Sequence, residues 1–201
     1  MKKIMFNDKY RLTQAVLEGR KTQTRRIAYI GNATIIDCGI CVETKNFGRA
    51  TIFRGIDEIS HSRYCIGEEV AVSQAYRELV SEAGYNEEEI NKLRCSKGWT
   101  NKMFVKADLM PHRIRITDIR AERLQDISDE DCIAEGIREQ YFYSGEEEPE
   151  FEGYSYYAKN VLKPLFCTPR EAYAALIDKI SGKGTWASNP YVFVYEFELI
   201  K

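Results

Sequence analysis

The chain has 201 residues, of which 44% are hydrophobic and 30% are charged, and its formal net charge is −2. These proportions are typical of a globular protein, and the length predicts one domain, residues 1–201, with insertions. The slightly negative charge excludes a wholly basic nucleic-acid coat, but a local basic patch is compatible with it. No stretch approaches the roughly 18 consecutive apolar residues of a membrane span. We therefore expect a cytoplasmic protein without a membrane partner.

The first predicted elements are a strand over residues 3–6 and a short helix that ends at Gly19. Asn7 or Asp8 can cap the helix, because a short side-chain oxygen accepts hydrogen bonds from free N–H groups of the first turn. The apolar residues of this helix recur with helical spacing, at Leu12, Ala15 and Val16. Gly19 stands where a helix commonly ends in a left-handed residue.

The helix is followed by a cationic segment, residues 19–26, which reads Gly-Arg-Lys-Thr-Gln-Thr-Arg-Arg. The segment offers a potential base, Lys21, and a potential nucleophile, Thr24. Its potential anion anchors are Arg20, Arg25 and Arg26. A regular strand from Lys21 would place Lys21 and Thr24 on opposite faces, so a shared site requires an irregular backbone near Thr22. The alternative interpretation is a solvated basic turn.

Short strands dominate the rest of the chain. Glycine and asparagine turns separate the first group, which is predicted to form hairpins over residues 33–36, 40–43 and 50–53. Later strands are predicted over residues 70–72, 102–107 and 112–119. The clearest strand is the last, residues 191–200, because it is aromatic and β-branched and follows Pro190.

Helices are fewer. Residues 79–94 are acidic and weakly patterned, which indicates a surface helix within an insertion. A compact helix is predicted over residues 128–135, capped by Ser128 and ended by Gly136. A third helix follows the capping box that begins at Thr168, with Pro169 in its first turn.

Two segments interrupt this pattern and are predicted to be insertions, at about residues 77–100 and 138–167. The second is acidic, rich in tyrosine and without periodicity, so we expect a long loop. Many short strands with helices at their corners predict an α+β, mainly β fold: a small β-barrel with a few peripheral helices.

The six cysteines are scattered and are expected to be free thiols, at Cys38, Cys41, Cys65, Cys95, Cys132 and Cys167. Cys38 and Cys41 form one CxxC pair, but a structural zinc site usually needs a second pair or two histidines beside it. The chain has only two histidines, and neither a metal nor an organic cofactor is predicted.

The cationic segment after its short helix resembles the signature of ASCH domains, which has the form G-x-K-T-x-T-x-R. Further matching segments are residues 67–70, 123–137 and 191–199. The chain is most similar to the larger bacterial members that are associated with phages or prophages. The resemblance implies a PUA-like β-barrel with a cleft for RNA or a nucleotide ligand.

Some small bacterial ASCH proteins are amidohydrolases that remove the acetyl group of N4-acetylcytidine, and another is described as a ribonuclease. Their working lysine, threonine and glutamate correspond here to Lys21, Thr24 and Glu135, with Glu130 as a substitute for the last. In one scheme Thr24 attacks, Lys21 takes its proton and Glu135 protonates the leaving amine. Attack by water, with Glu135 as base and Lys21 as oxyanion donor, uses the same residues.

Two other classes of function remain open. One is a non-catalytic RNA-binding module, because cationic grooves with aromatic platforms bind single strands. Its predicted ligand-binding residues are Arg20, Thr22, Arg25, Arg26, Arg113, Arg115, Tyr76 and Trp186, with Trp99 as a further stacking candidate. For Trp186, anchoring of its own loop is the alternative. The other class is an interaction protein that binds a host enzyme through the acidic segment 138–167.

Overall fold

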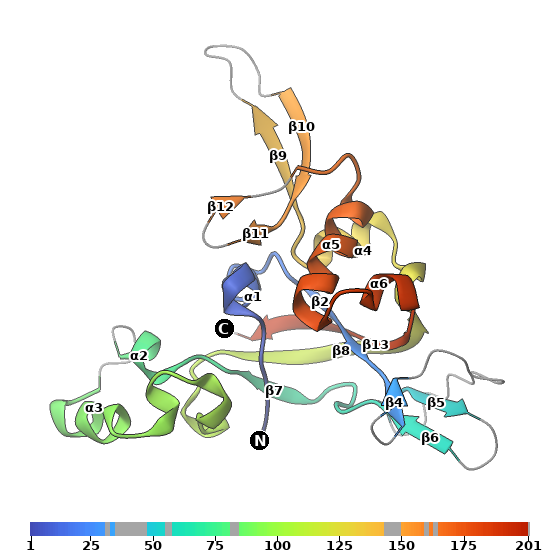
Figure 1. The fold of residues 1–201 in the computed structure, drawn as a ribbon. Coiled ribbons are helices and arrows are strands. Elements are labelled where there is room, and N and C mark those ends of the chain that lie inside the picture. The colour runs from blue at the N-terminus through green and yellow to red at the C-terminus, as the bar shows by residue number, and fades with distance from the viewer. Residues whose placement is uncertain are drawn as a thin grey trace.

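The computed structural model describes residues 1–30, 33–34, 48–54, 58–80, 85–142, 150–158, 161–162 and 165–200. A five-stranded sheet with the strand order β1-β7-β8-β13-β2 lies at its centre (Figure 1). Its strands are β1 (Lys2–Ile4), β7 (Glu69–Val72), β8 (Arg113–Arg123), β13 (Tyr191–Ile200) and β2 (Gln23–Ile27). β1 and β7 are parallel, and every other pair is antiparallel. The fold is therefore mixed α+β.

The two longest strands, β8 and β13, pair along their whole length and form the middle of the sheet. Ile114 and Ile116 of β8 are buried, whereas Arg113 and Arg115 are exposed. This alternation is the period-two pattern of a strand with one face on the core. The predicted strands over residues 112–119 and 191–200 are thus confirmed, and β8 continues to Arg123.

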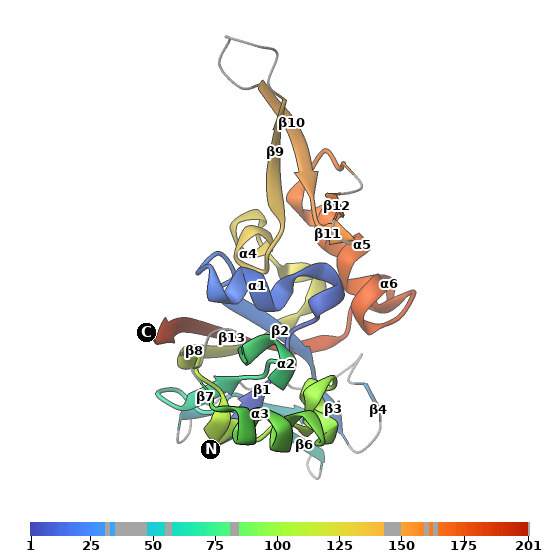
Figure 2. The same ribbon diagram turned by 90° about the vertical axis from the view of Figure 1, so that its left-hand side faces the viewer.

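Helices α1 (Leu12–Leu17), α4 (Asp129–Ala134) and α5 (Pro169–Ser181) lie over one face of this sheet (Figures 1 and 2). Ser128 caps α4 and a capping box from Thr168 opens α5, as predicted. Asn7 instead caps a 3-10 turn, η1 (Asp8–Tyr10), while α1 begins after Arg11 without a side-chain cap. Residues of α1, α5 and the sheet share one core, in which a fully buried leucine such as Leu176 contributes about 2 kcal/mol.

A second layer, which connects β7 to β8, lies beside the ends of these two strands, at the left in Figure 1. It contains α2 (Tyr76–Leu79), α3 (Glu87–Arg94) and the 3-10 turns η3 (Lys97–Trp99), η4 (Lys102–Phe104) and η5 (Ala107–Leu109). Between α2 and α3, residues 81–84 lie outside the described part of the chain. The strand predicted over residues 102–107 is wrong, because the Asn101 side chain accepts from the Met103 N–H and turns the chain there.

The segment 138–167 is not the patternless loop that we predicted. β9 (Arg138–Phe142) and β10 (Glu150–Ser155) form a hairpin that projects from the body (Figures 1 and 2), and β11 (Tyr157–Ala158) pairs with β12 (Val161–Leu162). The Tyr141 and Phe151 rings meet across the hairpin at 5.8 Å, a cross-strand pair that stabilises two strands without regular periodicity.

Two further hairpins pair β3 (Tyr29–Ile30) with β4 (Ala33–Thr34) and β5 (Thr51–Arg54) with β6 (Glu58–His61). The strand predicted over residues 40–43 and the Cys38–Cys41 pair lie outside the described residues. Within the described residues the five-stranded sheet is open, so the closed PUA-like barrel stays a prediction. Its two edges nevertheless approach each other, because Arg26 of β2 donates to the Met5 carbonyl after β1 at 2.6 Å.

None of the helices in the described ranges is both long and apolar enough to cross a membrane.

Candidate functional site

Backbone hydrogen bonds hold Lys21 in place between α1 and β2. The Thr22 N–H donates to the Ala134 carbonyl at 3.0 Å, and the Thr22 carbonyl accepts from the Phe197 N–H at 2.9 Å. Gly19, with φ of +73°, turns the chain out of the helix as predicted. Strand β2 begins only after Thr22. The irregular connection that Lys21 and Thr24 need in order to face one site is therefore present.

Glu135 comes from the other side of the site, at the C-terminal end of α4. Gly136 follows it with φ of +109°, a conformation that side chains rarely adopt. A β-carbon on Gly136 would lie 3.2 Å from Leu12 Cδ2 of α1. This close approach lets the end of α4 pack against α1, and the Thr22–Ala134 hydrogen bond then sets Glu135 beside Lys21.

Lys21 and Glu135 form a buried ion pair. Lys21 Nζ lies 2.5 Å from Glu135 Oε2 and 2.8 Å from the Glu135 carbonyl oxygen. Only 1% of Lys21 and 5% of Glu135 is exposed. Burial lowers the pKa of Lys21 below 10.5, since it disfavours the ammonium form, while the Glu135 carboxylate acts in the opposite direction. The geometry brings an amine and an acid into direct contact away from water.

Arg25 lies behind this pair and uses all five of its N–H donors. It donates twice to Glu122 and once each to Gln23, Asp131 and Glu135. A guanidinium has five donors in total, so none is left for a ligand. The predicted role of Arg25 as a phosphate anchor therefore does not fit, and its role here is to hold β2, β8 and α4 together.

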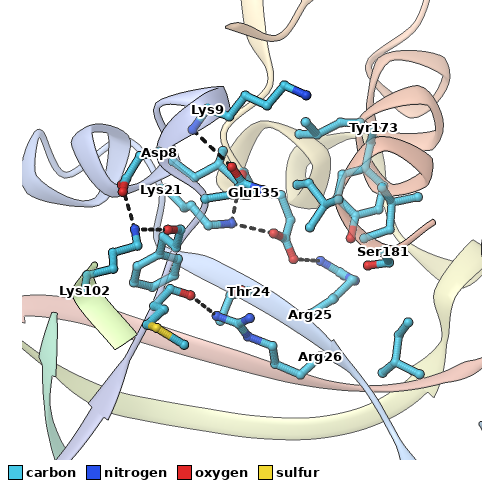
Figure 3. Close-up of a pocket in the computed structure, with 18 of the residues that line it drawn as sticks. Asp8, Lys9, Lys21, Thr24, Arg25, Arg26, Lys102, Glu135, Tyr173 and Ser181 are labelled. Carbon is cyan, nitrogen blue, oxygen red and sulfur yellow. Dashed lines mark hydrogen bonds and ion pairs between the residues drawn. The ribbon is translucent and has the colours of Figure 1, made fainter. Parts of the chain in front are cut away.

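A pocket of about 720 Å³ opens in front of these residues (Figure 3). Lys21, Thr24 and Glu135 all line it, together with Arg26 and Phe6. In Figure 3 the Lys21 ammonium points at the Glu135 carboxylate, with Thr24 below it on β2. This volume lies within the range of small-molecule sites, about 300–1,000 Å³.

Two hydroxyl groups at the pocket lack hydrogen-bond partners among the described residues. One is the Thr24 hydroxyl, which sits on the pocket wall. The other is the Tyr173 hydroxyl of α5, which is buried, and burial raises the pKa of Tyr173 well above 10.0. A buried polar group without a partner is unfavourable, so the Tyr173 hydroxyl is poised to bond a group that enters from the pocket.

The remaining cations that we predicted for the site separate into two groups. Arg26 lines the pocket and is exposed. Arg20 instead pairs with Glu18 at 2.6 Å and does not line it. Arg113 and Arg115 are placed elsewhere on the sheet, beside Glu69. The predicted grouping of Arg20, Arg113 and Arg115 in one basic cleft is wrong, because each pairs with a carboxylate near its own strand or helix.

The predicted aromatic platforms also lie elsewhere. Tyr76 is buried in the second layer, where its hydroxyl accepts from the Lys106 N–H, so it cannot stack on a base. Trp99 packs in the same layer. Trp186 packs against Tyr173 and anchors its own loop, as its alternative interpretation proposed. Thr22 is exposed and outside the pocket.

Sequence reasoning missed Asp131, Glu122 and Tyr173. One signal for Asp131 was available, because it stands one helical turn before Glu135 and therefore shares its face of α4. Burial disfavours ionised Asp131, but hydrogen bonds from Arg25 and Gln23 prevail and hold its pKa below 3.8. No local pattern marks Glu122 or Tyr173, since only the tertiary fold brings them to the site.

No protein-family model, curated protein or solved structure matches this chain. The resemblance to ASCH domains therefore stays a prediction carried by the motif. Within the described ranges, no cluster of three or more histidine, cysteine, aspartate or glutamate side chains is arranged to hold a metal ion. The cysteines described there, Cys65, Cys95, Cys132 and Cys167, are free thiols.

Proposed function

We propose that this chain binds a nucleoside-like ligand in the pocket beside Lys21 and hydrolyses an amide on it, of the N4-acetylcytidine type. The observation that carries the proposal is the buried contact of Lys21 with Glu135 on the wall of a pocket that Thr24 also lines. Amide hydrolysis needs a nucleophile, a base and an acid for the leaving amine, and these groups can supply all three. The same residues carry the ASCH resemblance, which adds a PUA-like barrel and an RNA or nucleotide ligand to the proposal.

One proton shift converts the ion pair into an acid and a base. Transfer from the Lys21 ammonium to the Glu135 carboxylate, across 2.5 Å, leaves a neutral amine and a neutral carboxylic acid. Burial favours the neutral amine of Lys21 because it lowers the pKa of this group. Lys21 can then take the Thr24 proton as Thr24 Oγ bonds to the acyl carbon. Glu135 protonates the amine as the C–N bond breaks, and water later releases the acyl group from Thr24.

A second route uses the pair in its ionised form. Glu135 accepts a proton from the water that bonds to the acyl carbon, and Lys21 donates to the developing oxyanion. Glu135 then returns this proton to the amine as the C–N bond breaks. In support of this route, Lys21 Nζ lies within hydrogen-bonding distance of Glu135 and forms no hydrogen bond with Thr24 among the described residues. Both routes need Lys21 and Glu135, and only the first needs the Thr24 hydroxyl.

Hydrolysis of N4-acetylcytidine, followed by chromatography of the released cytidine, tests the proposal. We expect Lys21→Met to lower kcat by about 10²- to 10⁴-fold, the usual effect of removing a general acid or base. Thr24→Val separates the routes, because it abolishes turnover only if Thr24 is the nucleophile. Thr22→Val is the matched control, since Thr22 belongs to the same segment but lies outside the pocket.

Mass spectrometry of the quenched wild-type protein provides an independent readout, because the first route leaves an acetyl group on Thr24. Folded wild-type protein that hydrolyses no acylated cytidine, whether as nucleoside, nucleotide or RNA, would rule out the hydrolase. Binding of these ligands without hydrolysis would favour the non-catalytic RNA-binding module.

A further inference from the structure

A second pocket, of about 400 Å³, adjoins the first along the gap between the two sheet edges. Met5, Arg26, Ile27 and Tyr29 line both pockets. A ligand seated in the first pocket can therefore extend into the second without leaving the protein surface.

The second pocket is cationic, in contrast to the ion-paired network behind the first. Lys3, Arg26 and Arg63 line it, and the described residues of its lining include no carboxylate. None of these three cations forms an ion pair within the described residues: Lys3 donates to the carbonyls of Met103 and Val105, and Arg26 also donates to a carbonyl. Backbone carbonyls carry no net charge, so the pocket keeps the positive potential of all three groups.

Aromatic side chains accompany this charge. Tyr29, on the wall common to both pockets, is 50% exposed. The Arg63 guanidinium carbon lies 5.7 Å from the centre of the Tyr64 ring, which restrains the direction of the guanidinium. An exposed aromatic face, here that of Tyr29, beside arginines without ion pairs is the combination that binds nucleotides in single strands, by stacking and phosphate contacts.

We propose that the second pocket is a phosphate subsite, so that the ligand is a nucleotide unit and not a free nucleoside. The base occupies the first pocket, which rests on the function proposed above, and the attached phosphate lies against Arg63 and Arg26. The arginine fork suits phosphate because it offers paired donors in one plane. Both a mononucleotide and a nucleotide within an RNA strand present this chemistry.

Calorimetric titration with product-like ligands tests the subsite without turnover. The probes are cytidine, cytidine 5′-monophosphate, cytidine 3′-monophosphate and a cytidine dinucleotide. We expect at least one phosphate-bearing probe to bind about tenfold more tightly than cytidine, the gain expected from a hydrogen-bonded charge contact. A dinucleotide that binds more tightly than both monophosphates would identify the strand as the source of the phosphate.

Arg63→Gln should remove this gain and leave the affinity for cytidine unchanged. It should also flatten the salt dependence, because each phosphate contact of a single strand contributes a slope of about −0.7 in a plot of log K against log salt. Arg63 is exposed, so the variant should fold. Arg77→Gln is the matched control, since Arg77 is an exposed arginine that lines neither pocket.

The outcomes distinguish this inference from the function on which it rests. Equal affinities for cytidine and its phosphates, or a phosphate gain that survives Arg63→Gln, would overturn the subsite and leave the base pocket standing. A phosphate gain that depends on Arg63, in a protein that does not hydrolyse acylated cytidine, would support the subsite and refute the hydrolase. Failure of every probe to bind would overturn both.

Discussion

The buried contact of Lys21 with Glu135 predicts a large energetic coupling. Lys21→Met keeps the length of the side chain and removes its charge, which leaves a carboxylate that is only 5% exposed. Removing one member of a buried ion pair costs about 3–5 kcal/mol. Because Arg25 still donates to Glu135 at 3.3 Å, we expect the lower end, about 3 kcal/mol of unfolding free energy. Glu135→Leu should cost more, about 4–5 kcal/mol, since Lys21 then keeps no carboxylate beside it.

The double variant, Lys21→Met with Glu135→Leu, removes both charges, so neither residue leaves the other as an unpaired buried charge. Two apolar side chains in place of a buried ion pair are often neutral or stabilising. We therefore expect the double variant to be more stable than Glu135→Leu alone. The coupling energy should therefore exceed the cost of Lys21→Met alone, about 3 kcal/mol, which is the top of the usual range for residues in contact.

Urea unfolding of the four proteins, followed by circular dichroism, measures this coupling, provided that the m-value stays the same. The exposed pair of Arg115 with Glu198 is the matched control. Its atoms are 3.3 Å apart, but its side chains are 47% and 57% exposed, so its coupling should stay below about 1 kcal/mol. Additive effects of Lys21→Met and Glu135→Leu would refute the buried pair, as would a coupling no larger than that of the control.

Three further predictions concern the surroundings of the pair. Tyr173→Phe removes a buried hydroxyl without a partner, so the unfolding free energy should not fall by more than about 1 kcal/mol. The affinity for cytidine should drop. A larger loss of stability would show that the hydroxyl is hydrogen-bonded within the protein. Gly136→Ala should destabilise by about 1–2 kcal/mol in urea unfolding, more than Gly182→Ala, because both glycines have positive φ but only the first would crowd α1. The pKa of Asp131 is lowered in the folded protein. The carboxylate therefore stabilises the fold fully above pH 3.8, and this stabilisation is lost as the pH falls through the lower pKa of the folded state. Wild type and Asp131→Asn should therefore converge in unfolding free energy in acid, and a constant difference would contradict the assignment.

Local patterns were sufficient for several elements. The alternation of β8, the aromatic and β-branched run of β13 and the caps at Ser128 and Thr168 are encoded within a few neighbouring residues, and these elements formed as predicted. Elements that depend on distant contacts were missed. The hairpin of β9 and β10 lacks a regular period and relies on cross-strand aromatic contacts.

The sequence alone marked the cationic segment as the candidate site, because the predicted helix ends at Gly19 and Lys21, Thr24 and several arginines follow it within a few residues. It also predicted the helix at whose C-terminal end Glu135 lies. Only the tertiary structure decided that Lys21 and Glu135, separated by 114 positions, are in contact. It also decided that all five N–H donors of Arg25 bond to other side chains of the protein. The physical reason is that helix caps and strand periods depend on near neighbours, whereas burial and ion pairing depend on which distant segments the folded chain packs together.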